Sequence, residues 1–431
     1  MSKSNYKPAL EALNKAITLD PGYADAYGAR AILHYKMGQR QKSYDDSRKS
    51  LLINPKNSLA YLALGLSKLG SGQFSTAIPD FEKSISADAK QSEAYIGKAI
   101  ALVGLGNNKE SIAMFTNAIK LDPQNTNILL GRGRAFELDG NSKSAIEDFS
   151  KAIKLAPSAE AYMARGRSLN SIGDYKSALD DLNRAITLNP KLVQTYCDRA
   201  KALAALGREK DSESNYRAAL KLDPRNSQAL FELSSIQLSS GQVSEAVKNL
   251  SQLVLLKPNF INGYILRAQC YRKLSKPNEA IADLSTAIRL DPKSKFAYAH
   301  RARCWNDLHS PEKAAADYSS IIQLDPDNTE ALLGRANAMI NSRHFDKALS
   351  DLSKLEERSF ALDAQFYGTR AYALMNSGKS EQAVDDYSEA IKMNSRVPEL
   401  YRDRAKAYEK LGKHDLAAAD IETANRLSAR Q

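Results

Sequence analysis

The chain has 431 residues, of which 43% are apolar and 26% are charged. This composition supports a folded core and is too polar for a protein embedded in a membrane. Three cysteines exclude a disulfide framework and favour a reducing, intracellular and cytoplasmic location. Met1 to Pro21 contains no long apolar run, so neither a signal peptide nor a membrane span is expected there. The net charge of +11 favours acidic partners.

Prolines return along the chain every 34 residues, which indicates an internal repeat. Pro21 and Pro55 are separated by this interval, and a series of glycines from Gly38 to Gly412 has the same period. Within each period, two apolar series at helical spacing are separated by the glycine and closed by the proline. Glycine can adopt the left-handed conformation that ends a helix, and proline cannot continue one. Each period is therefore predicted to be a helix–turn–helix unit.

In chain order, the predicted elements are a single-helix half-unit at 5–21 and then twelve two-helix units. The two-helix units are 22–55, 56–89, 90–123, 124–157, 158–190, 191–224, 225–258, 259–292, 293–326, 327–360, 361–395 and 396–431. The tenth unit lacks the usual closing Leu-Asp-Pro, so a bend of the chain is expected at 356–363. Ser275, His309 and Arg343 replace the turn glycine in three units, so these turns are expected to use other chemistry, with a change of local pitch around residues 270–345. Neither end carries an obvious capping helix, so a longer parent protein or self-association through the ends is expected.

Two charged positions recur when each unit is numbered so that its closing proline is position 32. Arginine at position 7 and aspartate at position 23 occur together in most units, and we expect these pairs to join the two helices. Exposed ion pairs contribute only ~0.2–1 kcal/mol each, so the pairs are expected to set register more than stability. The pairs are Arg30 with Asp46, Arg132 with Asp148, Arg165 with Asp181, Arg267 with Asp283, Arg301 with Asp317, Arg335 with Asp351, Arg370 with Asp386 and Arg404 with Asp420.

The repeated unit resembles the tetratricopeptide repeat. It has an aromatic residue at position 4, glycine or alanine at position 8, glycine at position 15, alanine at position 20 and proline at position 32. The closing strings Ile-Lys-Leu-Asp-Pro (119–123) and Ile-Arg-Leu-Asp-Pro (288–292) are typical of that family. The resemblance covers Tyr6 to Leu427. It implies an all-α fold, an α-α superhelical solenoid of about twelve repeats plus an N-terminal half-repeat, with the first helices on the concave face. It also implies a non-enzymatic scaffold or adaptor for protein–protein interaction.

Positions 5, 9, 12 and 13 of the first helices are predicted to face a ligand on the concave side. The N-terminal units offer apolar residues at these positions, and later units add arginine and lysine. This pattern favours a peptide or partner segment with apolar anchors and acidic flanks. An alternative is that position 5 belongs partly to the core and that the basic residues are ordinary solvated charges. The candidate partner-binding residues are Ile32, Leu62, Leu66, Ile96, Ile100, Leu130, Arg134, Met163, Arg167, Cys197, Lys201, Phe231, Ile265, Arg272, Lys273 and Arg303.

Several other functions find little support in the sequence. Position 6 is never asparagine, which opposes both the carboxylate clamp for chaperone tails and the asparagine ladder of the sugar-transferase superhelix. The five histidines are scattered and form no metal-binding motif, so neither metal nor cofactor is expected. Two alternatives stay open: a substrate-recruiting arm of a larger enzyme or assembly, and an RNA-binding repeat protein. Acidic residues interspersed among the basic ones, and the lack of an aromatic row, weigh against nucleic acid.

Overall fold

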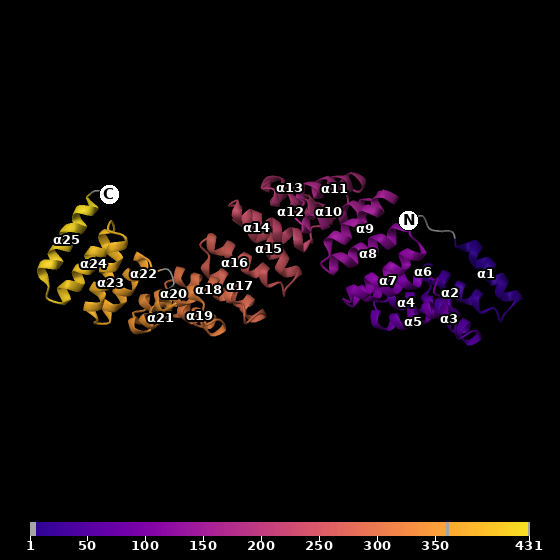
Figure 1. Ribbon diagram of the computed structural model, residues 1–431, viewed down its shortest axis with the longest axis horizontal. Coiled ribbons are helices and arrows are strands. Elements are labelled where there is room, and N and C mark those ends of the chain that lie inside the picture. Colours follow the sequence, from indigo (N-terminus) through magenta and orange to yellow (C-terminus); the bar gives the residue numbers. More distant parts are fainter. Residues whose placement is uncertain (1–5, 359–361, 430–431) are drawn as a thin grey trace. The chain divides into compact units, whose positions relative to one another are not determined.

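The computed structural model describes residues 6–358 and 362–429, which form 25 α-helices and no strand. The chain divides into two compact units, Met1–Pro224 and Arg225–Gln431. Figure 1 shows the helices in chain order, from indigo α1 to yellow α25. The bend predicted at 356–363 falls partly on residues 359–361, which lie outside the described residues.

The first unit contains thirteen helices and the second contains twelve. The helices of the first unit are α1 (Lys7–Leu19), α2 (Ala24–Lys36), α3 (Arg40–Ile53), α4 (Ser58–Leu69), α5 (Phe74–Ala87), α6 (Ser92–Gly104), α7 (Asn108–Leu121), α8 (Thr126–Leu138), α9 (Ser142–Leu155), α10 (Ala159–Ser171), α11 (Tyr175–Leu188), α12 (Val193–Ala205) and α13 (Glu209–Leu222). The helices of the second unit are α14 (Ser227–Ser239), α15 (Val243–Leu256), α16 (Ile261–Lys273), α17 (Pro277–Leu290), α18 (Lys295–Asp307), α19 (Pro311–Leu324), α20 (Thr329–Asn341), α21 (Phe345–Glu357), α22 (Ala364–Asn376), α23 (Ser380–Met393), α24 (Pro398–Lys410) and α25 (His414–Ser428).

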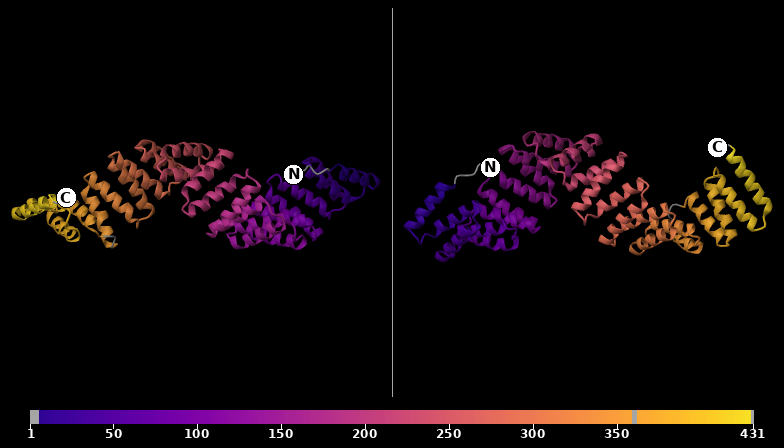
Figure 2. Two further views of the ribbon diagram at one scale, coloured as in Figure 1. Left: turned by 90° about the horizontal axis from the view of Figure 1, so that it is seen from above. Right: turned by 180° about the vertical axis from the view of Figure 1, so that it is seen from behind.

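Within each unit, every first helix packs on the second helix of its own repeat, and that second helix packs on the next first helix. Figure 2 shows these hairpin pairs side by side from two further directions. Successive first helices also contact one another, as α2 contacts α4 in the first unit and α16 contacts α18 in the second. Among the described residues, successive second helices make no contact as extensive. The first helices therefore form the inner layer of each unit, and they are the layer predicted to carry the ligand.

The turns between paired helices share one left-handed residue. Nine glycines, such as Gly241 with φ 82°, occupy this position. Ser275, His309 and Arg343 adopt the same conformation, with φ of 57°, 51° and 60°. These three turns thus reach the conformation of the glycine turns with other residues. The closing hydrogen bond overrides the residue preference: the Lys276 amide donates to the Tyr271 carbonyl at 2.9 Å, as in the glycine-containing turns.

Small residues allow the layers to approach closely. A Cβ added at Gly97 would lie 2.4 Å from the Phe81 ring, and one added at Gly133 would lie 2.5 Å from the Phe149 ring. Phe81 and Phe149 are fully buried second-helix residues. In these repeats the core is thus one large second-helix side chain set against glycine of the neighbouring first helices.

Candidate partner-binding face

The arginines and aspartates predicted to pair form eight bidentate ion pairs. In each pair the arginine Nε donates to Oδ2 of the aspartate and Nη2 donates to Oδ1, at 2.6–3.0 Å. The carboxylates are buried, and Asp148 is only 1% exposed. The pairs are therefore not exposed as expected, and a buried carboxylate that loses its guanidinium is costly. The hydrogen bond to Asp46 raises the pKa of Arg30, so the arginine stays charged.

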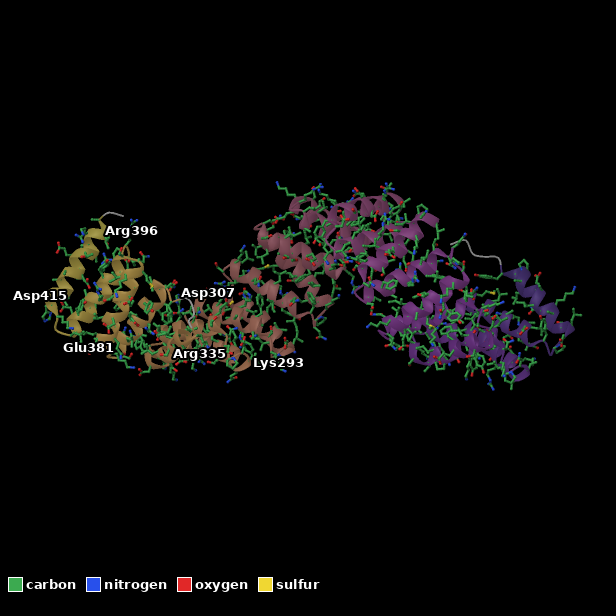
Figure 3. All side chains as sticks on the ribbon, viewed as in Figure 1. Lys293, Asp307, Arg335, Glu381, Arg396 and Asp415 are labelled. Atoms are coloured by element: carbon green, nitrogen blue, oxygen red, sulfur yellow. The ribbon has the colours of Figure 1, made fainter. Side chains whose placement is uncertain are left out.

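The same arginines also link successive repeats, which sequence reasoning missed. Nη1 of Arg301 donates to Ser285 Oγ of the preceding repeat at 3.0 Å, and Nη1 of Arg335, labelled in Figure 3, donates to Ser319 Oγ at 3.0 Å. The guanidinium of Arg301 also lies 5.7 Å from the ring centre of Tyr298, which occupies position 4 of the same repeat. The available signal was a hydroxyl or amide residue fifteen or sixteen positions before seven of the eight arginines; Arg370 instead contacts Glu356. These arginines are fully engaged in the scaffold.

In the first unit, the position-9 cations Arg134, Arg167 and Lys201 lie on the successive first helices α8, α10 and α12. Nη2 of Arg167 is 2.8 Å from Glu137 Oε2, and the Ser168 hydroxyl donates to Glu137 Oε1 at 2.7 Å. Arg134 and Lys201 are exposed and have no carboxylate within 4.0 Å among the described residues. A cleft of about 420 Å³ opens between Arg134 and Arg167. Two of the three predicted cations thus keep an uncompensated charge.

Asp198 of α12 is a buried carboxylate beside these cations. It is 3% exposed; Gln194 Nε2 donates to Oδ1 at 3.0 Å, and Oδ2 has no hydrogen-bond partner among the described residues. Burial raises the pKa of Asp198 to about 6, although Arg167 and Lys201 act in the opposite direction. The inner layer of the first unit therefore contains a carboxylate that titrates near neutral pH.

In the second unit, a cleft lies between the first helices α14, α16 and α18. It has a volume of about 900 Å³ and is lined by Leu238, Leu266, Arg272, Lys273, His300 and Asp307 among others. Nε of Arg272 is 2.5 Å from Oδ2 of Asp307, which Figure 3 labels at the C-terminal end of α18. Lys273 Nζ donates to the Leu238 carbonyl at 3.1 Å. The cleft therefore combines an apolar floor with fixed cations, and two of the predicted binding residues lie in its wall.

Helix α18 also carries residues that the sequence prediction did not single out for binding. The ring of Phe296 is 58% exposed and lies 4.3 Å from the His300 ring, centre to centre. Burial and the nearby Arg303 and Arg272 lower the pKa of His300 to about 4, so its imidazole is neutral at pH 7. A second cleft, of about 210 Å³, contains Phe296 and Arg303. The predicted residue Arg303 is exposed and has no carboxylate within 4.0 Å among the described residues.

Three apolar residues predicted to bind a partner are sealed in the core. Leu62 and Cys197 are 0% exposed and Ile265 is 6% exposed, so they present no surface to a ligand and that part of the prediction is wrong. Position 5 turns toward the second helix of its own repeat: Leu62, for example, belongs to the cluster around Phe81. Ile100 is 44% exposed and available. The remaining predicted apolar residues are half-buried: Ile32, Leu66, Ile96, Leu130, Met163 and Phe231.

Comparison with protein-family models identifies the repeat. Models described as tetratricopeptide repeat match residues 59–91, 96–160, 140–192, 197–255, 265–329 and 369–429, which together exceed half of the chain. The chain belongs to the tetratricopeptide repeat family. A search of curated proteins gave no match to this tetratricopeptide repeat chain.

Solved structures similar to this tetratricopeptide repeat protein are distant in sequence. A tetratricopeptide repeat protein from Parabacteroides merdae is 18% identical with a TM-score of 0.42, and the match covers 60% of this chain and 98% of that one. Cut9–Hcn1 of the APC/C is 13% identical with a TM-score of 0.41, covering 99% and 97%. Yeast Tom70 is 17% identical with a TM-score of 0.35, covering 92% and 95%. These likenesses are too weak to carry an argument about function.

Metal, thiol and membrane-spanning sites each have structural requirements, which can be compared with the described part of this tetratricopeptide repeat protein. Residues 6–358 and 362–429 contain no group of three or more histidine, cysteine or acidic side chains that could hold a metal ion. Burial raises the pKa of the Cys270 and Cys304 thiols to about 11, so both stay protonated and unreactive at neutral pH. None of the described helices is long and apolar enough to cross a membrane.

Proposed function

We propose that this tetratricopeptide repeat protein is a non-catalytic scaffold that binds a protein segment on the face formed by α14, α16 and α18. The observation that carries the proposal is the cleft of about 900 Å³ between these first helices. Leu238 and Leu266 offer apolar contacts in it, and Arg272 and Lys273 supply positive charge from its wall. Such a surface suits an extended or helical segment with apolar anchors.

The charges on this face favour acidic residues in the bound segment. Arg303 is exposed, lies beside the second cleft and lacks a carboxylate partner, so an acidic side chain of the ligand would compensate its charge. Asp307 holds Arg272 in a fixed orientation, and a fixed guanidinium loses less entropy when it donates to a second carboxylate. His300 is neutral at pH 7, so it adds no positive charge to this face.

Selection of short random peptides displayed on phage, with the full chain as the target, tests this proposal. We expect the enriched peptides to combine leucine, isoleucine or phenylalanine with aspartate or glutamate. Calorimetry with one enriched peptide should then show about tenfold weaker binding to Arg303→Glu, which is a loss of about 1.4 kcal/mol. Arg289→Glu is the matched control, because Arg289 is an exposed residue of the second helix α17 and should leave binding unchanged.

Enrichment of basic peptides would contradict the proposal. So would an equal loss of affinity in Arg303→Glu and Arg289→Glu, because a general charge effect would then explain the binding.

A further inference from the structure

The sixth repeat departs from the arginine–aspartate rule. Its arginine, Arg199, faces Asn215 at the position where the eight regular arginine–aspartate pairs place aspartate. Nε of Arg199 donates to Asn215 Oδ1 at 2.7 Å, and Nη1 donates to Asn183 Oδ1 at 2.8 Å. Nη2 has no hydrogen-bond partner among the described residues. In the eight regular pairs, Nη2 donates to an aspartate oxygen, as Arg165 does to Asp181 at 2.8 Å.

The asparagine removes both a charge and an acceptor. Its Nδ2 donates to the Asp211 carbonyl oxygen at 2.8 Å, so an amide nitrogen lies where a regular pair has the second carboxylate oxygen. Nη2 of Arg199 and Nδ2 of Asn215 are both hydrogen-bond donors. In the described residues they therefore lie together without an anionic acceptor. Burial lowers the pKa of Arg199, whereas the hydrogen bond to Asp181 raises the pKa of Arg165 in the preceding repeat. A half-buried guanidinium with only amide partners is an uncompensated cation.

A cavity adjoins this arginine. Its volume is about 240 Å³, and its polar wall is formed by Asn183, Arg199, Arg208, Asp211 and Asn215. Arg208 Nη2 is 2.6 Å from Asp211 Oδ2, so these two residues form a neutral pair at the rim and the net charge of the wall is that of Arg199. The volume accommodates a small anion with several waters and is too small for a folded segment.

We propose that the sixth repeat binds a small oxyanion, a phosphate or a carboxylate, which replaces the missing aspartate and accepts a hydrogen bond from Nη2 of Arg199. Charge-assisted bonds to a guanidinium are the strong class of hydrogen bond, and a partly desolvated site strengthens them further. The site is lined by α11, α12 and the start of α13 in the first unit, whereas the proposed peptide-binding cleft lies in the second unit. It is independent of the proposed peptide-binding function.

Calorimetric titration of the full chain with sodium phosphate, and separately with sodium acetate, tests the proposal at pH 7 and at an ionic strength held constant with chloride. We expect saturable binding of at least one of the two anions. Binding of phosphate alone identifies a phosphate source, and binding of acetate identifies a carboxylate, as an acidic side chain of a partner would supply. Absence of binding by both anions would overturn the proposal.

Two substitutions separate this site from other basic surface. Asn215→Asp restores the regular pair, so it should raise the melting temperature in chloride and weaken anion binding at least about tenfold. Asp148→Asn gives Arg132 in the fourth repeat the same amide partner in place of a carboxylate, and a second binding event is expected there. Unchanged anion affinity in a folded Asn215→Asp protein would place the binding elsewhere and refute the assignment.

Discussion

The most quantitative prediction concerns the buried carboxylate of Asp198. Its Oδ2 is buried without a hydrogen-bond partner, and burial raises its pKa from 3.8 to about 6. Each unit of pKa difference between the folded and unfolded chain corresponds to about 1.4 kcal/mol, so ionised Asp198 destabilises the fold by about 3 kcal/mol above pH 7. Asp198→Asn keeps the oxygen that accepts from Gln194 and removes the charge.

The direction of the pH dependence of stability follows from the difference in proton binding between the folded and unfolded chain. The folded chain holds the Asp198 proton more tightly than the unfolded chain, so this contribution to stability is complete below about pH 3.8 and is lost as pH rises through 6. The free energy of unfolding of Asp198→Asn should therefore exceed that of the wild type by about 3 kcal/mol at pH 8 and by about 1.5 kcal/mol at pH 5.

Hydrogen exchange of the α12 amides at pH 8 and pH 5 measures this difference locally, because solenoid repeats open in parts. Asp180→Asn, which removes an exposed carboxylate of the neighbouring helix α11, is the control and should change little at either pH. A less stable Asp198→Asn protein at pH 8 would refute the reasoning. It would mean that attraction to Arg167 and Lys201 outweighs the cost of burial.

Three further substitutions test the packing rules of the repeat. Arg343→Gly should raise the unfolding free energy by about 0.5–1 kcal/mol, because it relieves a left-handed non-glycine residue; an unchanged melting temperature would contradict this. Gly97→Ala should cost roughly 1–3 kcal/mol through contact with Phe81, and the cost should shrink in a Phe81→Leu background. Asp148→Ala should cost about 2–4 kcal/mol in urea unfolding, whereas breaking the exposed Glu389–Lys392 pair should cost under about 0.5 kcal/mol. Similar losses of unfolding free energy on breaking the buried Asp148 pair and the exposed Glu389–Lys392 pair would contradict the importance of burial.

The sequence was sufficient to predict the fold because its two periodic signals have local causes. The turn residue and the closing proline act within a few residues of their own position, so their spacing alone predicts helical pairs. The turns at Ser275, His309 and Arg343 could not be predicted, because the closing hydrogen bond, and not the residue type, decides their conformation.

The candidate face was less predictable because it depends on side-chain direction. Leu62 and Ile265 share a helix face with exposed residues at helical spacing, and only the packed second helix shows that they are covered. Likewise, Arg167 and Arg272 were predicted to bind a ligand, but Glu137 and Asp307, from neighbouring repeats, already contact them. The sequence does not reveal such pairings across repeats without the helix orientations.

Hydrogen exchange of the full chain with and without the selected acidic peptide tests the central proposal most directly. We expect peptide-dependent protection from exchange in the first helices α14, α16 and α18, with little change in the second helices α15 and α17. Protection confined to α15 and α17, or spread evenly over both layers, would contradict binding at the first-helix face.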